Sequence, residues 1–267
     1  MKKIIALLLV VFSLPTFAQS ENKFVKIDSL LTYLASNNKF MGNVALQEGD
    51  KIVFEKNYGF ANVESKTKAD ASTRYKIGSI TKMFTSVVIF QLVEEKKLTL
   101  DTKLSKFFPS IKNSENISIE NLLEHSSGIY SFTNDADYKE YAKLPKTRAE
   151  LMKKIKAGNP IFEPGESAEY SNSNFVLLGW IIEDITKKKY AENIKTRIIN
   201  KIGLKNTGFA SETKNEAISY HTNGKSWQQA SKEDMTIPGG AGAILSNASD
   251  LTKFINSLYA GKLISQT

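Results

Sequence analysis

The spacing of apolar residues in the first part of the chain predicts a helix, a hairpin and a second, longer helix. Residues 24–38 carry apolar side chains at 24, 25, 27, 30, 31 and 34, which is the spacing of an amphipathic helix. Residues 42–62 hold two short apolar runs joined by a polar turn with a glycine, which is the pattern of a β-hairpin. After a polar loop at 63–73, residues 74–95 predict a short strand, a turn and a long buried helix.

The rest of the chain is patterned mainly as helices. Apolar spacing, capping residues and glycine stops predict helices over 118–126, 146–158, 173–189, 190–204 and 246–262. The glycines of 237–244 predict a flexible loop before the last helix. We therefore expect an α/β protein of the α+β type, with a mostly helical region over 96–235. Because a two-stranded hairpin is marginal in water, we also expect that strands of its antiparallel sheet are missing.

The first residues have the pattern of a secretory signal peptide. Lys2 and Lys3 precede an apolar run at 4–14, and small residues at 16 and 18 precede a cut after residue 18. The run is too short to span a bilayer, and no later stretch is long and apolar enough to do so. We expect residues 1–18 to be removed and residues 19–267 to form one exported domain, periplasmic or secreted, in a bacterium.

Composition excludes several classes of function. The chain has no cysteine, so disulfides and thiolate nucleophiles are excluded, and His125 and His221 are not in a metal-binding spacing. We therefore expect neither a metal nor another cofactor. The net charge is +8, but the lysines are spread along the chain and interleaved with acids. That distribution is typical of a solvated surface, so we expect no nucleic-acid partner.

A serine and a lysine at the head of the long apolar helix are the first candidate site. The S-x-x-K spacing occurs five times, but only the copy formed by Ser79 and Lys82 opens a long apolar helix. Residues three apart on a helix are neighbours, so the two side chains lie on one face. Free backbone N–H groups and the positive end of the helix dipole would stabilise an oxyanion beside Ser79.

The lysine has two interpretations. Held against an apolar helix, the Lys82 ammonium is desolvated and its pKa should fall, so that its amine takes the Ser79 proton or relays it to a second base. Alternatively, Lys82 merely extends to solvent from a helix end.

A second candidate motif lies in the loop before the helix at 173–189. Tyr170 and Asn172 form the only Y-x-N among ten tyrosines, and residues two apart in an extended segment project to the same side. Beside a charged Lys82, the phenol of Tyr170 would exchange protons with Ser79, and Asn172 would bind both Lys82 and a substrate amide. The alternative is a helix entry in which Asn172 or Ser173 is the cap and Tyr170 packs in the core.

Together these motifs resemble those of a known superfamily. Ser79-Ile-Thr-Lys82 followed by Tyr170-Ser-Asn172 resembles the serine β-lactamases and penicillin-binding proteins, and the Y-x-N form resembles their class C β-lactamase and D-alanyl-D-alanine carboxypeptidase branch. The segments "GNVALQEGDKIVFEKNYGFAN", "LLEHSSGI", "FEPGESAEYSNSNFVLLGWIIE" and "PGGAGAILSNASDLTKF" agree with that branch. The resemblance implies a β-lactamase/transpeptidase-like fold, Ser79 as acylated nucleophile, Lys82 and Tyr170 sharing the general-base work, and Asn172 positioning substrate.

The sequence departs from this family in its third motif. The family carries K-[ST]-G or H-x-G on a strand that lines the cleft, whereas this chain offers only "KNTG" at 205–208 and "HTNG" at 221–224, both before the glycine stretch. We interpret Gly208 and Gly224 as turn glycines. The chain resembles a C-terminally incomplete member, so residues 19–267 alone are expected to be poorly stable and nearly inactive, with an uncovered sheet.

Two functional hypotheses follow. The first is a serine hydrolase that acylates on Ser79 and acts on a D-Ala-D-Ala peptide of peptidoglycan, a β-lactam or a small ester or amide. The second is a catalytically inactive relic or cell-wall-binding module that retains the cleft. His125 and Asp250 are interpreted as structural residues at helix ends. The sequence indicates no oligomeric state.

Overall fold

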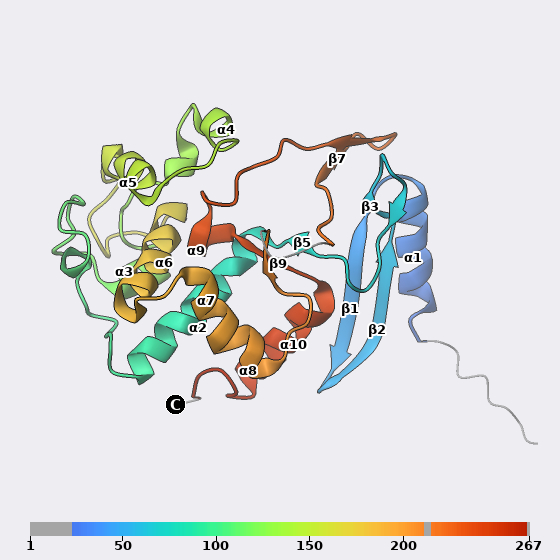
Figure 1. Cartoon of the computed structure of the whole chain (residues 1–267), viewed down its shortest axis with the longest axis horizontal. Helices are drawn as coiled ribbons and strands as arrows, with labels where there is room; N and C mark the ends of the chain where they lie inside the picture. The colour runs from blue at the N-terminus through green and yellow to red at the C-terminus, as the bar shows by residue number, and fades with distance from the viewer. Residues whose placement is uncertain (1–22, 211–214, 266–267) are drawn as a thin grey trace, which may run out of the picture.

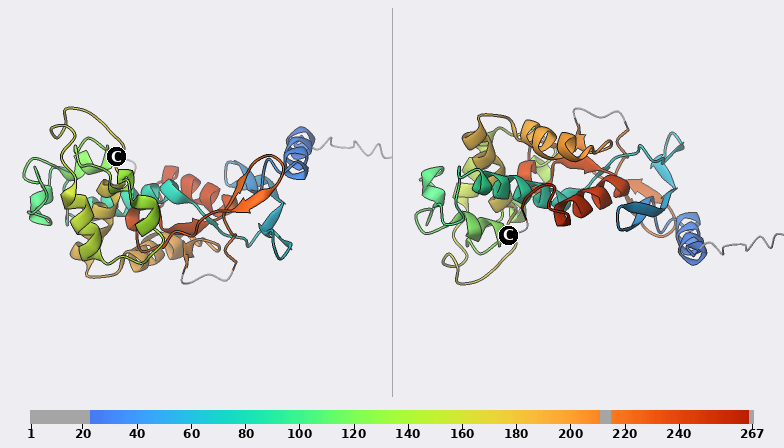
Figure 2. Two further views of the ribbon diagram at one scale, coloured as in Figure 1. Left: turned by 90° about the horizontal axis from the view of Figure 1, so that it is seen from above. Right: turned by 90° about the horizontal axis from the view of Figure 1, so that it is seen from below.

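The computed structural model describes residues 23–210 and 215–265, so the predicted signal peptide at 1–18 lies outside the described residues. The molecule is elongated, with the β1–β2 hairpin and α1 at one end and α4 and α5 at the other (Figures 1 and 2). Between them, α2 runs through the middle of a helical body. Within the described ranges, no helix is long and apolar enough to cross a membrane.

The predicted hairpin is present, and α1 lies on its outer side (Figure 1). Strands β1 (Gly42–Glu48) and β2 (Lys51–Tyr58) pair antiparallel, and α1 spans Val25–Ser36. A second, three-stranded antiparallel sheet has the order β5-β9-β6. Its strands are β5 (Tyr75–Lys76), β9 (Ile244–Ser246) and β6 (Gly208–Phe209). Two smaller antiparallel pairs are formed by β3 (Phe60–Asn62) with β4 (Thr67–Lys68) and by β7 (Tyr220–Thr222) with β8 (Trp227–Gln229).

The predicted helical segments after the hairpin all contain helix, but the segment 190–204 is divided into α7, a π turn and α8, and α4 and α9 were not predicted as helices. The helices are α2 (Thr81–Glu94), α3 (Ile119–Leu123), α4 (Tyr138–Tyr141), α5 (Arg148–Ala157), α6 (Asn172–Thr186), α7 (Tyr190–Ile194), α8 (Asn200–Ile202), α9 (Gly239–Gly242) and α10 (Ala248–Tyr259). Short 3₁₀ turns occupy η1 (Gly78–Ile80), η2 (Leu104–Lys106) and η3 (Phe132–Asn134), and a π turn, η4 (Lys195–Ile199), joins α7 to α8. The helix predicted over 118–126 ends at Leu123, because His125 takes a left-handed conformation with φ 62°.

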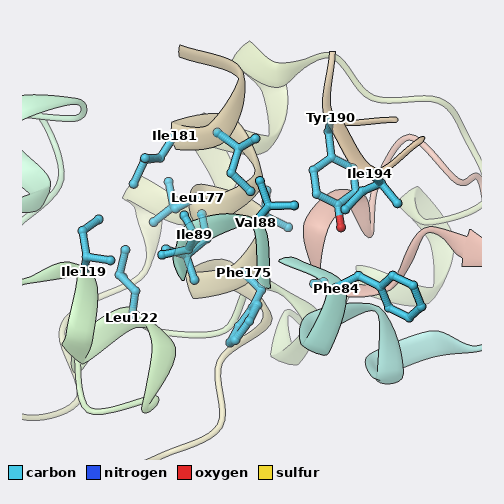
Figure 3. Close-up of a cluster of buried hydrophobic side chains, with 14 of the residues drawn as sticks. Phe84, Val88, Ile89, Ile119, Leu122, Phe175, Leu177, Ile181, Tyr190 and Ile194 are labelled. Carbon is cyan, nitrogen blue, oxygen red and sulfur yellow. The ribbon is translucent and has the colours of Figure 1, made fainter. Parts of the chain in front are cut away.

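The core lies where α2, α6 and α7 meet (Figure 3). Phe84 and Ile89 of α2 and Leu177 and Ile181 of α6 are fully buried there. Each such side chain contributes roughly 1.5–3 kcal/mol by leaving water. The long helix at 81–94 is therefore held rigidly, and its first turn is a firm platform for reactive side chains.

The glycine stretch at 237–244 is not a flexible loop, so that prediction was wrong. It forms α9 and then β9, and α9 packs on α6. A Cβ on Gly240 would lie 2.5 Å from the Phe175 carbonyl oxygen, and Gly179 of α6 is also within 3.3 Å. Thr85 fixes α9 from the other side by donating to the Gly240 carbonyl at 2.7 Å. These glycines are therefore needed for close packing and not for flexibility.

Candidate active site

The nucleophile candidate stands at the head of α2. Strand β5 is tied to β9, and Ile77 N donates to the Ile244 carbonyl at 3.1 Å. The chain then turns through Gly78, whose φ of 52° favours glycine, into η1 and α2. Ser79 is exposed at this turn, whereas Lys82, one turn on, is only 7% exposed.

The structure brings together the four side chains that the two sequence motifs singled out. Ser79 Oγ lies 2.6 Å from the Tyr170 hydroxyl, and either atom could be the donor. Lys82 Nζ donates to Ser79 Oγ at 3.1 Å and to Asn172 Oδ1 at 2.9 Å. The catalytic roles assigned to these residues stay predictions, but the shared pocket that those roles require exists.

Burial is the main influence on Lys82. Desolvation lowers the pKa of its ammonium from the ordinary value of 10.5, and the Tyr170 phenol partly offsets this. The ammonium also donates to the Ala241 carbonyl at 3.0 Å, so three oxygen atoms surround it. Lys82 therefore does not extend to solvent, and its nitrogen is held within hydrogen-bond distance of Ser79 Oγ.

Asn172 is oriented by hydroxyl groups that the sequence did not reveal. Its Nδ2 donates to Thr133 Oγ1 at 3.0 Å, and its backbone N–H donates to Ser131 Oγ at 3.0 Å. Asn172 is the first residue of α6, but Ser171 is the N-cap and no side chain makes a capping bond. The helix-cap alternative for Asn172 is therefore wrong, because its amide is engaged by Lys82 and Thr133.

Tyr170 is half exposed and is supported by His125. Their rings lie 4.6 Å apart, and His125 also contacts Phe175 at 5.2 Å. The His125 Nδ1 accepts a hydrogen bond from Ser171 N at 3.1 Å, which fixes it as the unprotonated nitrogen. Burial, and to a lesser degree the charge of Lys82, lowers the pKa of His125. His125 thus holds the loop that carries Tyr170, and the alternative of a core Tyr170 does not apply.

The two stretches closest to a third motif lie elsewhere. Lys205 is exposed, and Gly208 pairs with Leu245 in the sheet, so the interpretation of Gly208 as a turn glycine was wrong. His221 is exposed on β7, and Gly224 has the positive φ of 80° expected in a turn. Asp250 accepts from the backbone N–H of Asn206 at 2.7 Å, as fits a structural residue.

A cleft of about 180 Å³ opens beside Ser79 and Asn172. Its walls contain charged residues, aromatic rings and backbone that motif searching did not find. They include Lys76, Thr133, Tyr138, Glu233, Met235 and Ala241. No pattern in the sequence marks these residues, because they come from separate loops and strands. Among residues 23–210 and 215–265, no group of three or more His, Asp or Glu side chains is arranged to hold a metal ion.

Comparison with known proteins identifies the family of the chain. The Beta-lactamase family model matches residues 34–267. A teichoic acid D-alanine hydrolase of Staphylococcus aureus is 30% identical over 257 residues, which cover 93% of this chain and 61% of that protein. The chain thus spans about three fifths of the length of the curated relatives it matches.

Solved structures give the same result. FmtA from Staphylococcus aureus is 30% identical, with a TM-score of 0.80 over 92% of this chain and 68% of that chain. A D-stereospecific amidohydrolase from Streptomyces sp. is 28% identical, with a TM-score of 0.76 over 89% and 73% of the two chains. The predicted fold class is confirmed, whereas the absence of sheet strands stays a prediction. The chain belongs to the Beta-lactamase family, in the superfamily of serine β-lactamases and penicillin-binding proteins.

Proposed function

We propose that this protein is an exported serine hydrolase that forms an acyl-enzyme on Ser79 and acts on an ester or amide. The observation that carries the proposal is the contact of one hydroxyl with both a buried amine and a phenol, at 3.1 and 2.6 Å. A serine hydroxyl is a weak nucleophile at neutral pH and needs such a base. The export rests on the signal-peptide pattern of residues 1–18.

The geometry supports a simple sequence of steps. Ser79 Oγ attacks the substrate carbonyl carbon, and its proton passes to the pair formed by Lys82 and Tyr170. The same pair returns a proton to the departing alcohol or amine, which leaves the acyl group on Ser79. The pair then deprotonates a water molecule that attacks the carbonyl carbon of this ester. As the bond from that carbon to Ser79 Oγ breaks, the pair returns the proton to Ser79, and the acid is released. The head of α2 favours the negative charge that develops on the carbonyl oxygen.

The names of relatives narrow the first substrates to try. One relative is a teichoic acid D-alanine hydrolase and another is a D-stereospecific amidohydrolase. Esters and amides of D-alanine are therefore the leading candidates, followed by D-Ala-D-Ala peptides and β-lactams. The cleft of about 180 Å³ suits a small acyl group.

Labelling by an active-site fluorophosphonate tests the proposal. We expect the wild type to be labelled and Ser79→Ala not to be, because the probe reacts only with an activated hydroxyl. Tyr170→Phe should be labelled roughly a hundredfold more slowly, as is usual when a general base is removed. Equal labelling of the wild type and Ser79→Ala would exclude Ser79 as nucleophile. A folded wild type that is not labelled would favour the second hypothesis, a chain that keeps the cleft without the chemistry.

A further inference from the structure

Residues 231–238, between β8 and α9, contribute to the wall of the cleft. Glu233, Met235 and Pro238 of this segment line the same cleft as Ser79. The segment is anchored to the connection between α4 and α5: Asp234 N donates to the Ala142 carbonyl at 2.8 Å, and Thr236 Oγ1 accepts from Lys146 N at 2.9 Å. Its side chains therefore stand at defined positions relative to the serine.

One carboxylate on this side of the cleft is available to a ligand. Glu216 is engaged with Lys76 at 3.8 Å, and Asp234 accepts from both the N–H and the hydroxyl of Thr236. Glu233, in contrast, makes no hydrogen bond or ion pair with any other side chain or backbone group in the part of the chain that the structure describes. A solvated carboxylate at the mouth of an active-site cleft favours a cationic substrate group.

Glu233 also influences a second residue of the cleft wall, Tyr138. Tyr138, which lines the same cleft, has its pKa raised by burial and, secondarily, by the negative charge of Glu233. Phe132, Met235 and Pro238 line the same cleft and supply apolar surface in it. The cleft thus combines a nucleophile, an apolar wall, a lysine (Lys76) that is paired with Glu216, and one carboxylate without a cation partner.

We propose that Glu233 binds the free α-ammonium group of an aminoacyl substrate whose carbonyl carbon is attacked by Ser79. This assignment rests on the proposed function and specifies its substrate class: esters and amides of unblocked amino acids, not N-acylated peptides. The ammonium is attached to the carbon next to the carbonyl, so it has to lie in the same cleft as the reacting bond. Its pairing with Glu233 is a charge-assisted hydrogen bond.

Binding of boronic acids separates this inference from the proposed function. The boronic acid analogue of D-alanine and its N-acetyl derivative both accept the Ser79 oxygen at boron, but only the first carries an ammonium group. We expect the wild type to bind the free-amine analogue about fivefold more tightly, which corresponds to the upper end for a solvent-accessible ion pair. Glu233→Gln should abolish this preference and leave the N-acetyl affinity unchanged. Glu140→Gln, an exposed carboxylate on α4 outside the cleft, is the matched control.

Each result decides the question. Loss of the preference in Glu233→Gln alone supports the assignment. Equal affinity of the wild type for both analogues, or a preference that survives Glu233→Gln, overturns it and leaves Ser79 as nucleophile. Binding of neither analogue overturns both the assignment and the proposed function. Calorimetric titration, with Ser79→Ala as the zero reference, gives all of these affinities.

Discussion

At the scale of single residues, the site depends on one amine kept out of water. Lys82 is nearly buried, and its ammonium donates to three neutral oxygen atoms and lies over the rings of Tyr170 and Phe175. Burial disfavours the charged form, so its pKa lies below 10.5. A lowered pKa increases the fraction of free amine at a given pH, and in the proposed mechanism this free amine removes the serine proton.

The first prediction concerns the pH dependence of this step. The rate of fluorophosphonate labelling should rise with pH as Lys82 loses its proton, with a midpoint below 10.5. Lys82→Arg keeps a positive charge that does not titrate in this range, so its labelling should be slow and nearly independent of pH. A variant that kept the pH profile of the wild type would show that Lys82 is not the titrating group.

The second prediction uses the two histidines as a matched pair. Neutral His125 accepts from Ser171 N, and its lowered pKa means that the folded state resists its protonation. The contribution of neutral His125 to the free energy of unfolding is complete above the ordinary pKa of 6.5, and it is lost as pH falls through the lowered pKa of the folded state. The melting temperature of the wild type should therefore fall more steeply from about pH 7 to pH 5 than that of His125→Gln. His221→Gln, at an exposed position, should follow the wild type.

At the scale of elements, the site depends on how closely α9 approaches α6. The Ala241 carbonyl that holds Lys82 belongs to α9, and the approach is possible because Gly240 and Gly179 lack side chains. The third prediction is that Gly240→Ala lowers the free energy of unfolding by roughly 3 kcal/mol, since the clashing atom is a backbone oxygen. Ser79 labelling should slow as well.

The neighbouring glycine provides the control for this substitution. Gly239 has φ 40°, but a Cβ there meets no atom within 4 Å. Gly239→Ala should therefore cost only the backbone term of about 1 kcal/mol, and it should leave labelling nearly unchanged. Chemical denaturation of both variants checks the prediction. Equal losses would mean that the packing of α9 on α6 is loose.

The same element shows what the sequence could and could not predict. Ser79 and Lys82 were predictable, because their spacing places them on one turn of a helix with a clear apolar pattern. Tyr170 was linked to them by resemblance to the family, since the sequence around Tyr170 does not indicate which distant segment of the chain it contacts. The hydrogen bond from Lys82 to the Ala241 carbonyl could not be predicted, because every residue has a backbone carbonyl and no sequence pattern marks the one that is used. Glycines were ambiguous, because flexibility and close packing select the same residue.

At the scale of the whole molecule, the hairpin and the helical body differ in how much they bury. Strands β1 and β2 form a two-stranded sheet, and α1 beside them has no buried residue. Val25, Leu30 and Tyr33 of α1 are each more than half exposed, at 53%, 55% and 58%. In contrast, α2 and α6 share a continuous core. Stability is therefore unevenly distributed along the molecule.

The fourth prediction follows from this uneven burial. Amide hydrogen exchange should be at least about a hundredfold faster in residues 25–58 than in α2 and α6, because opening the hairpin exposes little apolar surface whereas opening the core exposes much. The link between the two parts is α10, which contacts β1 and stacks Phe254 on Phe84 at 3.9 Å. Phe254→Ala should therefore accelerate exchange in both parts. Equal protection of the hairpin and the core in the wild type would mean that the molecule unfolds as one cooperative unit, and that the expected marginal stability of the hairpin is wrong.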